Sequence, residues 1–207
     1  MIMKIKATDI VTFAVIFVLV IGLGGMAGYK SDKDTQLPDN SFVIESGNGG
    51  QYRIDEYDGQ FYAFLKLSNG ADYYLAFRTD PRELDSISID LEAVEIISSA
   101  NKIYTSVNPE DTGGKVAVAV LELDRAISLL NPVKITEAFY KEAVPENPNV
   151  PLKGCKDSTA DQVIIEFRID AQESVYVEDN CVVVEGTSSN SLIKASTRLG
   201  YALVGIY

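Results

Sequence analysis

The chain has 207 residues, of which 46% are hydrophobic and 23% are charged, a composition typical of one folded domain with an accessory segment. Thirty acidic residues against 18 basic ones give a net charge of −12, so a nucleic-acid partner is not expected. The chain contains no histidine, which excludes Ser-His-Asp triads, Cys-His dyads and HExxH zinc sites.

The longest apolar segment is 10–29, IVTFAVIFVLVIGLGGMAGY, which carries no charged residue. At about 1.5 Å per residue, a helix of this length spans roughly 30 Å, the thickness of the hydrocarbon core of a bilayer. We therefore expect a transmembrane helix that acts as an uncleaved signal anchor, after a short cytoplasmic segment over 1–9. A cleaved signal peptide is the alternative, because Gly25 and Ala27 are small residues at the spacing that signal peptidase recognises.

The residues around this segment bear on its orientation and packing. A short basic amino-terminus with Lys4 and Lys6, followed by a long acidic part, favours a single-pass protein of the cell membrane whose carboxyl-terminal domain is extracytoplasmic. The opposite orientation stays open, since lysines follow the segment as well. Gly24 and Gly28 form a GxxxG motif, which lets two helices approach closely and would allow self-association.

A polar linker is expected over 30–40, and a soluble α+β domain over 41–207, with an alternative sub-boundary at the proline-bearing stretch 144–151. Phe42–Ile44 is predicted as the first strand. Gln60–Leu67 and Ala71–Phe77 are aromatic-rich runs separated by Ser-Asn-Gly, which predicts a β-hairpin because Asn and Gly both tolerate positive φ.

The middle of the chain alternates helical and extended patterns. A short helix is predicted to begin at Pro81 behind a Thr79 or Asp80 cap, and apolar residues at three- and four-residue intervals predict a helix over Lys115–Leu130. Residues 86–90 are predicted to be extended, and residues 91–100 could be a strand or a helix. A strand is predicted over 102–107 and a short helix over 136–143.

The last third is predicted as a three-stranded meander over 162–169, 174–178 and 181–185, followed by a helix that begins near Ser189 or Asn190. The expected fold class is α+β: a transmembrane helix, then one mixed α/β extracytoplasmic domain with antiparallel hairpins or a meander and two or three longer helices.

Cys155 and Cys181 are the only two cysteines. They do not form a CxxC redox motif, and two sulfurs without histidine make a poor zinc site, so a disulfide or two inert thiols remain. A hairpin centred near Gln172 would place Cys181 opposite Val163, within reach of the loop that carries Cys155. We expect the disulfide, because an outward-facing domain lies in an oxidising compartment.

Few other residues indicate chemistry. Arg78, Asp80 and Arg82 gather at a predicted helix start, where two arginines could hold an anion or the carboxylate of a partner; a capped helix with internal ion pairs is the alternative. The tyrosines at 57, 62, 73 and 74 could form a binding face or be half-buried sheet residues. No cofactor, metal or catalytic residue is expected, since no phosphate- or dinucleotide-binding motif occurs.

Three stretches carry a resemblance: FRTDPREL at 77–84, NCVVVEG at 180–186 and RLGYALVGI at 198–206. Behind an amino-terminal span, they make the chain similar to single-pass membrane proteins of archaea that have no assigned activity. The resemblance implies a membrane location and no catalytic residues.

The expected function is binding or scaffolding by a membrane-anchored extracytoplasmic domain, with an envelope protein as partner or with self-association. One alternative is a pilin-like filament subunit, for which Lys6 and Ala7 just before the apolar run offer a weak processing site. Another is an envelope hydrolase that uses paired carboxylates, which the 30 acidic residues permit by residue type.

Overall fold

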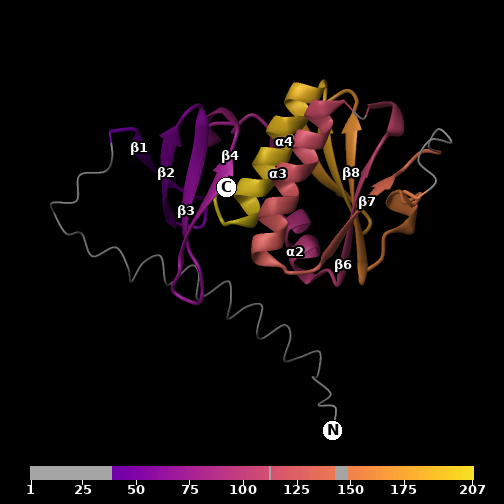
Figure 1. Cartoon of the computed structure of the whole chain (residues 1–207), viewed down its shortest axis with the longest axis horizontal. Helices are drawn as coiled ribbons and strands as arrows, with labels where there is room; N and C mark the ends of the chain where they lie inside the picture. The colour runs from indigo at the N-terminus through magenta and orange to yellow at the C-terminus, as the bar shows by residue number, and fades with distance from the viewer. Residues whose placement is uncertain (1–38, 112, 143–148) are drawn as a thin grey trace, which may run out of the picture. The chain divides into compact units, whose positions relative to one another are not determined.

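The computed structural model describes residues 39–111, 113–142 and 149–207. They form two compact units, one made mainly of residues up to Ala76 and the other mainly of Phe77–Gly205 (Figure 1). An antiparallel sheet, a mixed sheet and three α-helices confirm the α+β class. The transmembrane helix expected over 10–29 lies outside the described residues, as do most of the linker and most of the predicted sub-boundary at 144–151. One domain over 41–207 stays a prediction.

The first unit is a four-stranded antiparallel sheet with strands in chain order. The strands are β1 (Ser41–Glu45), β2 (Gln51–Tyr57), β3 (Gln60–Lys66) and β4 (Asp72–Phe77). The predicted hairpin is confirmed: the Leu67 amide donates to the Ala71 carbonyl at 2.9 Å, and the Gly70 amide donates to the Leu67 carbonyl at 2.8 Å. Gly70 has a φ of 82°, a value that glycine adopts without strain.

Side chains alternate between the two faces of this sheet, as they do in any β-strand. Ile54 lies opposite Ala63 in the β2–β3 register, and both are fully buried. Arg53 and Asp55 flank Ile54 on β2 and therefore lie on the other face, which is only partly buried. The sheet thus has one buried face and one face that carries polar and aromatic side chains.

The second unit contains a six-stranded mixed sheet in the order β5-β9-β10-β8-β6-β7. Its strands are β5 (Ser88–Ile89), β6 (Lys102–Val107), β7 (Lys134–Phe139), β8 (Gln162–Ile169), β9 (Ser174–Glu178) and β10 (Cys181–Gly186). Its helices are α2 (Glu92–Ser99), α3 (Gly114–Leu130) and α4 (Ser189–Leu203), with 3-10 turns η1 (Pro81–Glu83), η2 (Pro109–Asp111) and η3 (Cys155–Asp157).

The prediction of a meander over β8, β9 and β10 is wrong in its pairing. All three strands exist, but β10 pairs with β8 in parallel, and β9 lies on the other side of β10 in antiparallel pairing. Every residue from Val163 to Phe167 on β8 is buried, as is every residue of β10. Strands buried on both faces are typical of the centre of a parallel sheet, whereas a meander with one solvated face would alternate.

The short helix predicted over 136–143 is also wrong, because β7 occupies Lys134–Phe139. This strand pairs in parallel with β6, so that Thr136 lies opposite Tyr104 and Ala138 lies opposite Ser106. The crossover from β6 to β7 is α3, which makes a βαβ unit. Pairing with a buried neighbour therefore outweighs the weak helical pattern, and the β-branched side chain of Thr136 suits a strand.

α3 and α4 lie side by side across one face of the six-stranded sheet (Figure 1). Leu123 and Ile127 on α3 and Leu192 and Leu199 on α4 are fully buried, as the apolar spacing predicts. The helices approach closely, since the Ser196 hydroxyl donates to the Ala119 carbonyl at 2.6 Å. Small side chains on α4 therefore allow its tight packing on α3.

The end of β10 meets the start of α4 at Gly186. A Cβ atom added there would lie 2.3 Å from the backbone nitrogen of Leu192. Gly186→Ala should therefore lower the free energy of unfolding by roughly 2 kcal/mol, because the backbone must shift. Urea unfolding measures this change. Gly114→Ala is the control, since a Cβ atom there meets nothing within 4 Å; equal effects of the two substitutions would contradict the prediction.

Candidate functional site

Asp80 and Arg82 form an ion pair within the chain. Asp80 caps η1 by accepting a hydrogen bond from the Arg82 amide at 2.9 Å, and Nε of Arg82 donates to both carboxylate oxygens of Asp80 at 2.9 and 3.0 Å. The hydrogen bonds from Arg82 hold the pKa of Asp80 below its ordinary value. An external anion would therefore compete with Asp80 for this guanidinium.

Arg78 has a different partner. Its Nε lies 3.8 Å from Oε2 of Glu122 on α3, a residue that is only 5% exposed. Burial raises the pKa of Glu122, while hydrogen bonding from the Thr197 hydroxyl and the charge of Arg78 act in the opposite direction. Both arginines of the predicted anion site thus face carboxylates of this chain, and anion or partner binding at Arg78, Asp80 and Arg82 stays a prediction.

The disulfide between Cys155 and Cys181 is confirmed. Cys155 begins η3 and Cys181 begins β10, 26 positions later, with a Cα–Cα distance of 5.1 Å. Cys181 is fully buried in an apolar cluster that includes Ile164 and Val183, whereas Cys155 is partly exposed at the edge of that cluster. The bridge holds η3 against the face of the sheet opposite to the helices, because Cys181 and Gly186 lie on opposite faces of β10.

The burial of Cys181 predicts that the native bridge resists reduction. A thiolate that attacks the accessible sulfur of Cys155 must expel a thiolate at Cys181, where apolar surroundings disfavour the charge. Dithiothreitol should therefore reduce the folded protein about a hundredfold or more slowly than the urea-unfolded protein, since reduction requires local opening. Mass spectrometry after thiol alkylation measures both rates. Equal rates in the two states would contradict the prediction.

A network around Arg168 lies beside the bridge, and sequence reasoning missed it. The Arg168 guanidinium donates to Oε1 of Glu166 at 2.8 Å, to both carboxylate oxygens of Glu178 at 3.1 Å, and to Sγ of Cys155 at 3.4 Å. Burial alone lowers the pKa of this guanidinium, but the hydrogen bonds with Glu178 and Glu166 raise it above its ordinary value. Arg168 therefore stays charged within a partly buried set of acids.

Three further contacts belong to the network. The amide of Cys155 donates to Oε2 of Glu166 at 2.9 Å, the Arg168 guanidinium donates to the Tyr176 hydroxyl oxygen at 3.1 Å, and the Tyr176 hydroxyl donates to Glu185 at 2.9 Å. Burial and this hydrogen bond raise the pKa of Tyr176 to about 12, so the hydroxyl keeps its proton. The acids of the network are thus bound by donors of this chain. The geometry anchors η3 and the bridge to the sheet and leaves no carboxylate of the network positioned as a general base.

A signal for this network exists in the sequence. Glu166 and Arg168 lie two residues apart on β8, as do Tyr176 and Glu178 on β9, so each pair shares one face of its strand. The predicted hairpin centred near Gln172 would itself place Glu178 opposite Glu166 and Tyr176 opposite Arg168, so this part of the network could have been inferred from the sequence. The meander prediction misses that β10 lies between β8 and β9 and adds Glu185 to the network.

Sγ of Cys155, Sγ of Cys181 and a carboxylate oxygen of Glu166 lie within 4.8 Å of one another. This grouping does not make a metal site, because the two sulfurs are bonded to each other and thiolates are the metal-binding form.

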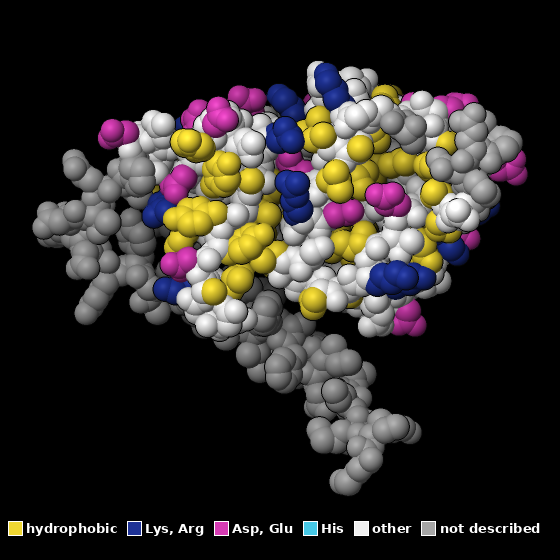
Figure 2. Space-filling view, viewed as in Figure 1, with side chains coloured by type: hydrophobic (Ala, Val, Ile, Leu, Met, Phe, Trp, Pro, Cys, Tyr) yellow, Lys and Arg dark blue, Asp and Glu magenta, His cyan; other side chains and the backbone are white. Residues whose placement is uncertain are grey.

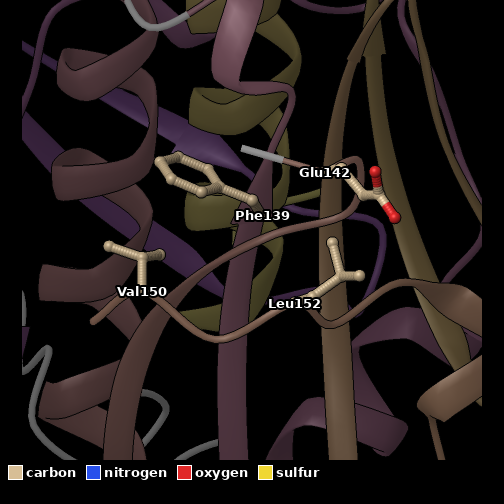
Figure 3. Close-up of a pocket in the computed structure, with 4 residues that line it drawn as sticks. All are labelled: Phe139, Glu142, Val150 and Leu152. Atoms are coloured by element: carbon tan, nitrogen blue, oxygen red, sulfur yellow. The ribbon is translucent and has the colours of Figure 1, made fainter. Parts of the chain in front are cut away.

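A surface pocket of about 260 Å³ is lined by Phe139, Glu142, Val150 and Leu152. Figure 3 shows its three apolar side chains, with the Glu142 carboxylate directed away from the Phe139 ring. Among the residues that the structure describes, the lining has one carboxylate, whereas a retaining or inverting glycosidase requires a pair.

Asp124 on α3 is a buried acid whose protonation is strongly perturbed. Burial, and secondarily the charge of Glu137 on β7, raise its pKa to about 7, and its Oδ1 atom is buried without a hydrogen-bond partner among the described residues. A pKa above the unfolded value of 3.8 means that the folded state binds the proton more tightly. The contribution of Asp124 to stability is therefore fully present below about pH 4 and is lost as the pH rises to about 7.

Asp124→Asn removes this ionisation while keeping the side-chain shape. We expect the substitution to raise the free energy of unfolding by roughly 1 to 2 kcal/mol at pH 8 and to change it little at pH 4. Urea unfolding at the two pH values measures the difference. Asp85→Asn, at an exposed position, is the control and should show no such dependence. A gain for Asp124→Asn that is equal at both pH values would contradict the assignment.

Aromatic side chains form a second feature, on the partly buried face of the first unit. The Arg53 guanidinium carbon lies 4.7 Å from the ring centroid of Phe64, and the guanidinium donates to the Tyr74 hydroxyl at 2.6 Å and to Asp55 at 2.8 Å. Tyr62 lies opposite Asp55 in the β2–β3 register and therefore shares this face. We call Arg53, Tyr57, Tyr62, Phe64 and Tyr74 the aromatic face.

The tyrosines singled out by sequence divide between the two sides of the sheet. Tyr57 is 72% exposed and Tyr74 is 48% exposed, and both belong to the aromatic face. Tyr73, 39% exposed, precedes Tyr74 on β4 and so lies on the opposite side.

The expected membrane features cannot be placed in the fold. Gly24 and Gly28, the expected helix-packing residues, lie outside the described residues. Within residues 39–111, 113–142 and 149–207, no helix is both long and apolar enough to cross a bilayer.

Comparisons of the chain with protein-family models, curated proteins and solved structures find no match.

Proposed function

We propose that the chain is a membrane-anchored protein whose folded part lies outside the cytoplasm and serves as a binding or scaffolding component of the cell envelope. The uncharged segment 10–29 would be the anchor. The acidic character of the chain would keep the exposed part soluble.

The disulfide is the observation that carries this proposal. Disulfides persist in oxidising compartments and are rare in the cytosol, where thiols are kept reduced. Cys155 and Cys181 join two segments of the fold, and Cys181 is fully buried within the core. Such a bridge fits a structural role in a compartment outside the cytoplasm.

A binding role is favoured over catalysis by how the polar groups are used. Glu166, Glu178 and Glu185 accept hydrogen bonds from Arg168, the Cys155 amide and Tyr176, so they act as structural acceptors. The chain also lacks histidine, the commonest general acid or base. The exposed rings of the aromatic face are, by contrast, suited to contact a partner.

Protease treatment of intact cells tests the topology. The full-length chain, with an epitope tag after Tyr207, should lose its tag when protease is added outside cells. A cytoplasmic marker protein must survive the same treatment. Protection of the tag until the membrane is permeabilised would overturn the proposal.

Amino-terminal sequencing of the protein isolated from its membrane separates the anchor from its alternatives. The proposal predicts an intact terminus. Cleavage near Ala27 would indicate a secreted domain, and cleavage near Ala7 would indicate a pilin-like subunit.

A further inference from the structure

We propose that the aromatic face is a docking surface for a protein partner that presents apolar side chains surrounded by lysine and arginine. This inference rests on the proposed function, since it names the surface by which an envelope-binding domain would act.

Three side chains of the aromatic face, those of Arg53, Phe64 and Tyr74, hold one another in place before any partner arrives. Arg53 lies over the Phe64 ring, its guanidinium carbon is 5.7 Å from the Tyr74 ring centroid, and the two rings themselves are 5.2 Å apart at an interplanar angle of 60°. Asp55 binds Arg53 and accepts a further hydrogen bond from the Ser41 hydroxyl at 2.6 Å. Because these contacts restrict the rotamers of the three side chains, binding costs them little further side-chain entropy.

The composition of the face matches the centres of protein interfaces. Tyrosine and arginine are enriched among the residues that dominate binding energy, and an aromatic ring contributes a large contact area with only two side-chain torsions. Tyr57 and Tyr74 are largely exposed, and Val43, opposite Arg53 in the β1–β2 register, is 42% exposed. These side chains lie around the ion pair of Arg53 and Asp55, whose opposite charges neutralise each other.

Charge around the face selects the partner. From 39 to 76 the chain carries six acidic and two basic residues, a net charge of −4. Glu45, Asp58 and Asp72 are exposed at the strand ends and turns that border the sheet, and Figure 2 shows acidic side chains among the hydrophobic ones over the four-stranded sheet. A basic rim on the partner would be attracted, whereas a second copy of this chain, with its own charge of −12, would be repelled.

Photo-crosslinking on the full-length chain in its native membrane tests the proposal, because the reaction captures a partner whose identity is not specified in advance. The photoreactive residue p-benzoylphenylalanine is placed at Tyr57 in one protein and at Tyr73, on the opposite side of the sheet, in the matched control. We expect an adduct from position 57 with a distinct protein, mapped to a segment that contains lysine or arginine, and none from position 73. The proposal would be overturned if the adduct from position 57 contained a second copy of this chain, a glycan or a lipid. It would also be overturned if positions 57 and 73 gave adducts in equal yield.

The cross-linked protein, once purified, then serves as the ligand. Tyr74→Ser should weaken its binding about thirtyfold, as expected for a central interface residue, while Tyr73→Ser should change the Kd by less than about twofold. Raising the salt concentration from about 0.1 M to about 1 M shortens the Debye length from about 10 Å to about 3 Å and should weaken binding severalfold. Thermal unfolding confirms that both variants are folded. Equal losses for the two variants, or binding that is insensitive to salt, would contradict the assignment.

The outcomes also separate this inference from the proposed function. If position 57 gives no adduct while external protease still removes the tag, the aromatic face is not the docking surface and the topology stands. If the tag is protected in intact cells, the proposed function itself fails, whatever the cross-linking shows.

Discussion

Replacement of both cysteines by alanine is expected to lower the free energy of unfolding by about 3.5 kcal/mol. The bridge closes a loop between residues 26 positions apart, and its loss frees the unfolded chain to adopt more conformations. Part of the loss also comes from the core, because Cys181 is fully buried. Urea unfolding of the full-length chain in detergent, followed by tyrosine fluorescence, measures the change.

Reduced wild-type protein, unfolded under the same conditions, is the control for Cys155→Ala/Cys181→Ala. The reduced protein retains both cysteine side chains and lacks only the S–S bond. Its free energy of unfolding should therefore be lower than that of the oxidised protein by most of the amount expected for the double variant. If the oxidised protein and the double variant unfold at the same urea concentration, the bridge does not stabilise the fold as described.

Arg168→Ala is expected to lower the free energy of unfolding by about 3 kcal/mol, the low end for breaking a buried ion pair, because Arg168 itself is partly exposed. The cost arises mainly at Glu166, which is 5% exposed and would keep only the Cys155 amide as a donor. The same urea titration measures the change.

Two further variants identify the cause. Arg82→Ala removes an arginine whose side chain is 57% exposed from its ion pair with Asp80, and should cost less than about 1 kcal/mol. Adding Glu166→Gln to Arg168→Ala removes the uncompensated charge and should recover part of the loss. If Arg82→Ala and Arg168→Ala cost the same, or if the double variant is less stable than Arg168→Ala alone, the loss does not come from an uncompensated charge on the buried Glu166.

Local patterns predicted the elements with strong local signals. The apolar stripe of α3, the Asn-Gly turn of the β3–β4 hairpin and the serine-capped start of α4 each follow from interactions between residues close in sequence. Asp80 and Pro81 likewise predict the cap and start of a short helix, which the structure has as the 3-10 turn η1.

Strand order could not be predicted in the same way, because it depends on contacts distant in sequence. β7 is a strand because it pairs with β6 across the α3 crossover, and β10 enters between β8 and β9 although it follows both in the chain. The uninterrupted apolar runs of β8 and β10 do indicate central, doubly buried strands. The prediction of a meander did not take this signal into account.

The disulfide shows how a correct prediction can rest on a wrong register. The expected position of Cys181 opposite Val163 does not occur; Cys181 lies opposite Glu178 on β9, and β10 runs parallel to β8. The pairing of the cysteines followed from elimination of metal and redox motifs and from the expected compartment. The predicted register could have brought Arg168 close to Glu178, but the contacts of the network with Cys155 and with Glu185 on β10 depend on positions that the register did not provide.

The redox state of Cys155 and Cys181 in the native membrane tests the central claim most directly. Cells are treated with a membrane-permeant alkylating reagent before lysis, and the mass of the full-length chain is measured without reductant. A bridged, outward-facing domain predicts an unmodified chain with no alkylated cysteine. Two alkylated cysteines in protein taken from its native membrane would contradict the claim that this domain is held by a disulfide outside the cytoplasm.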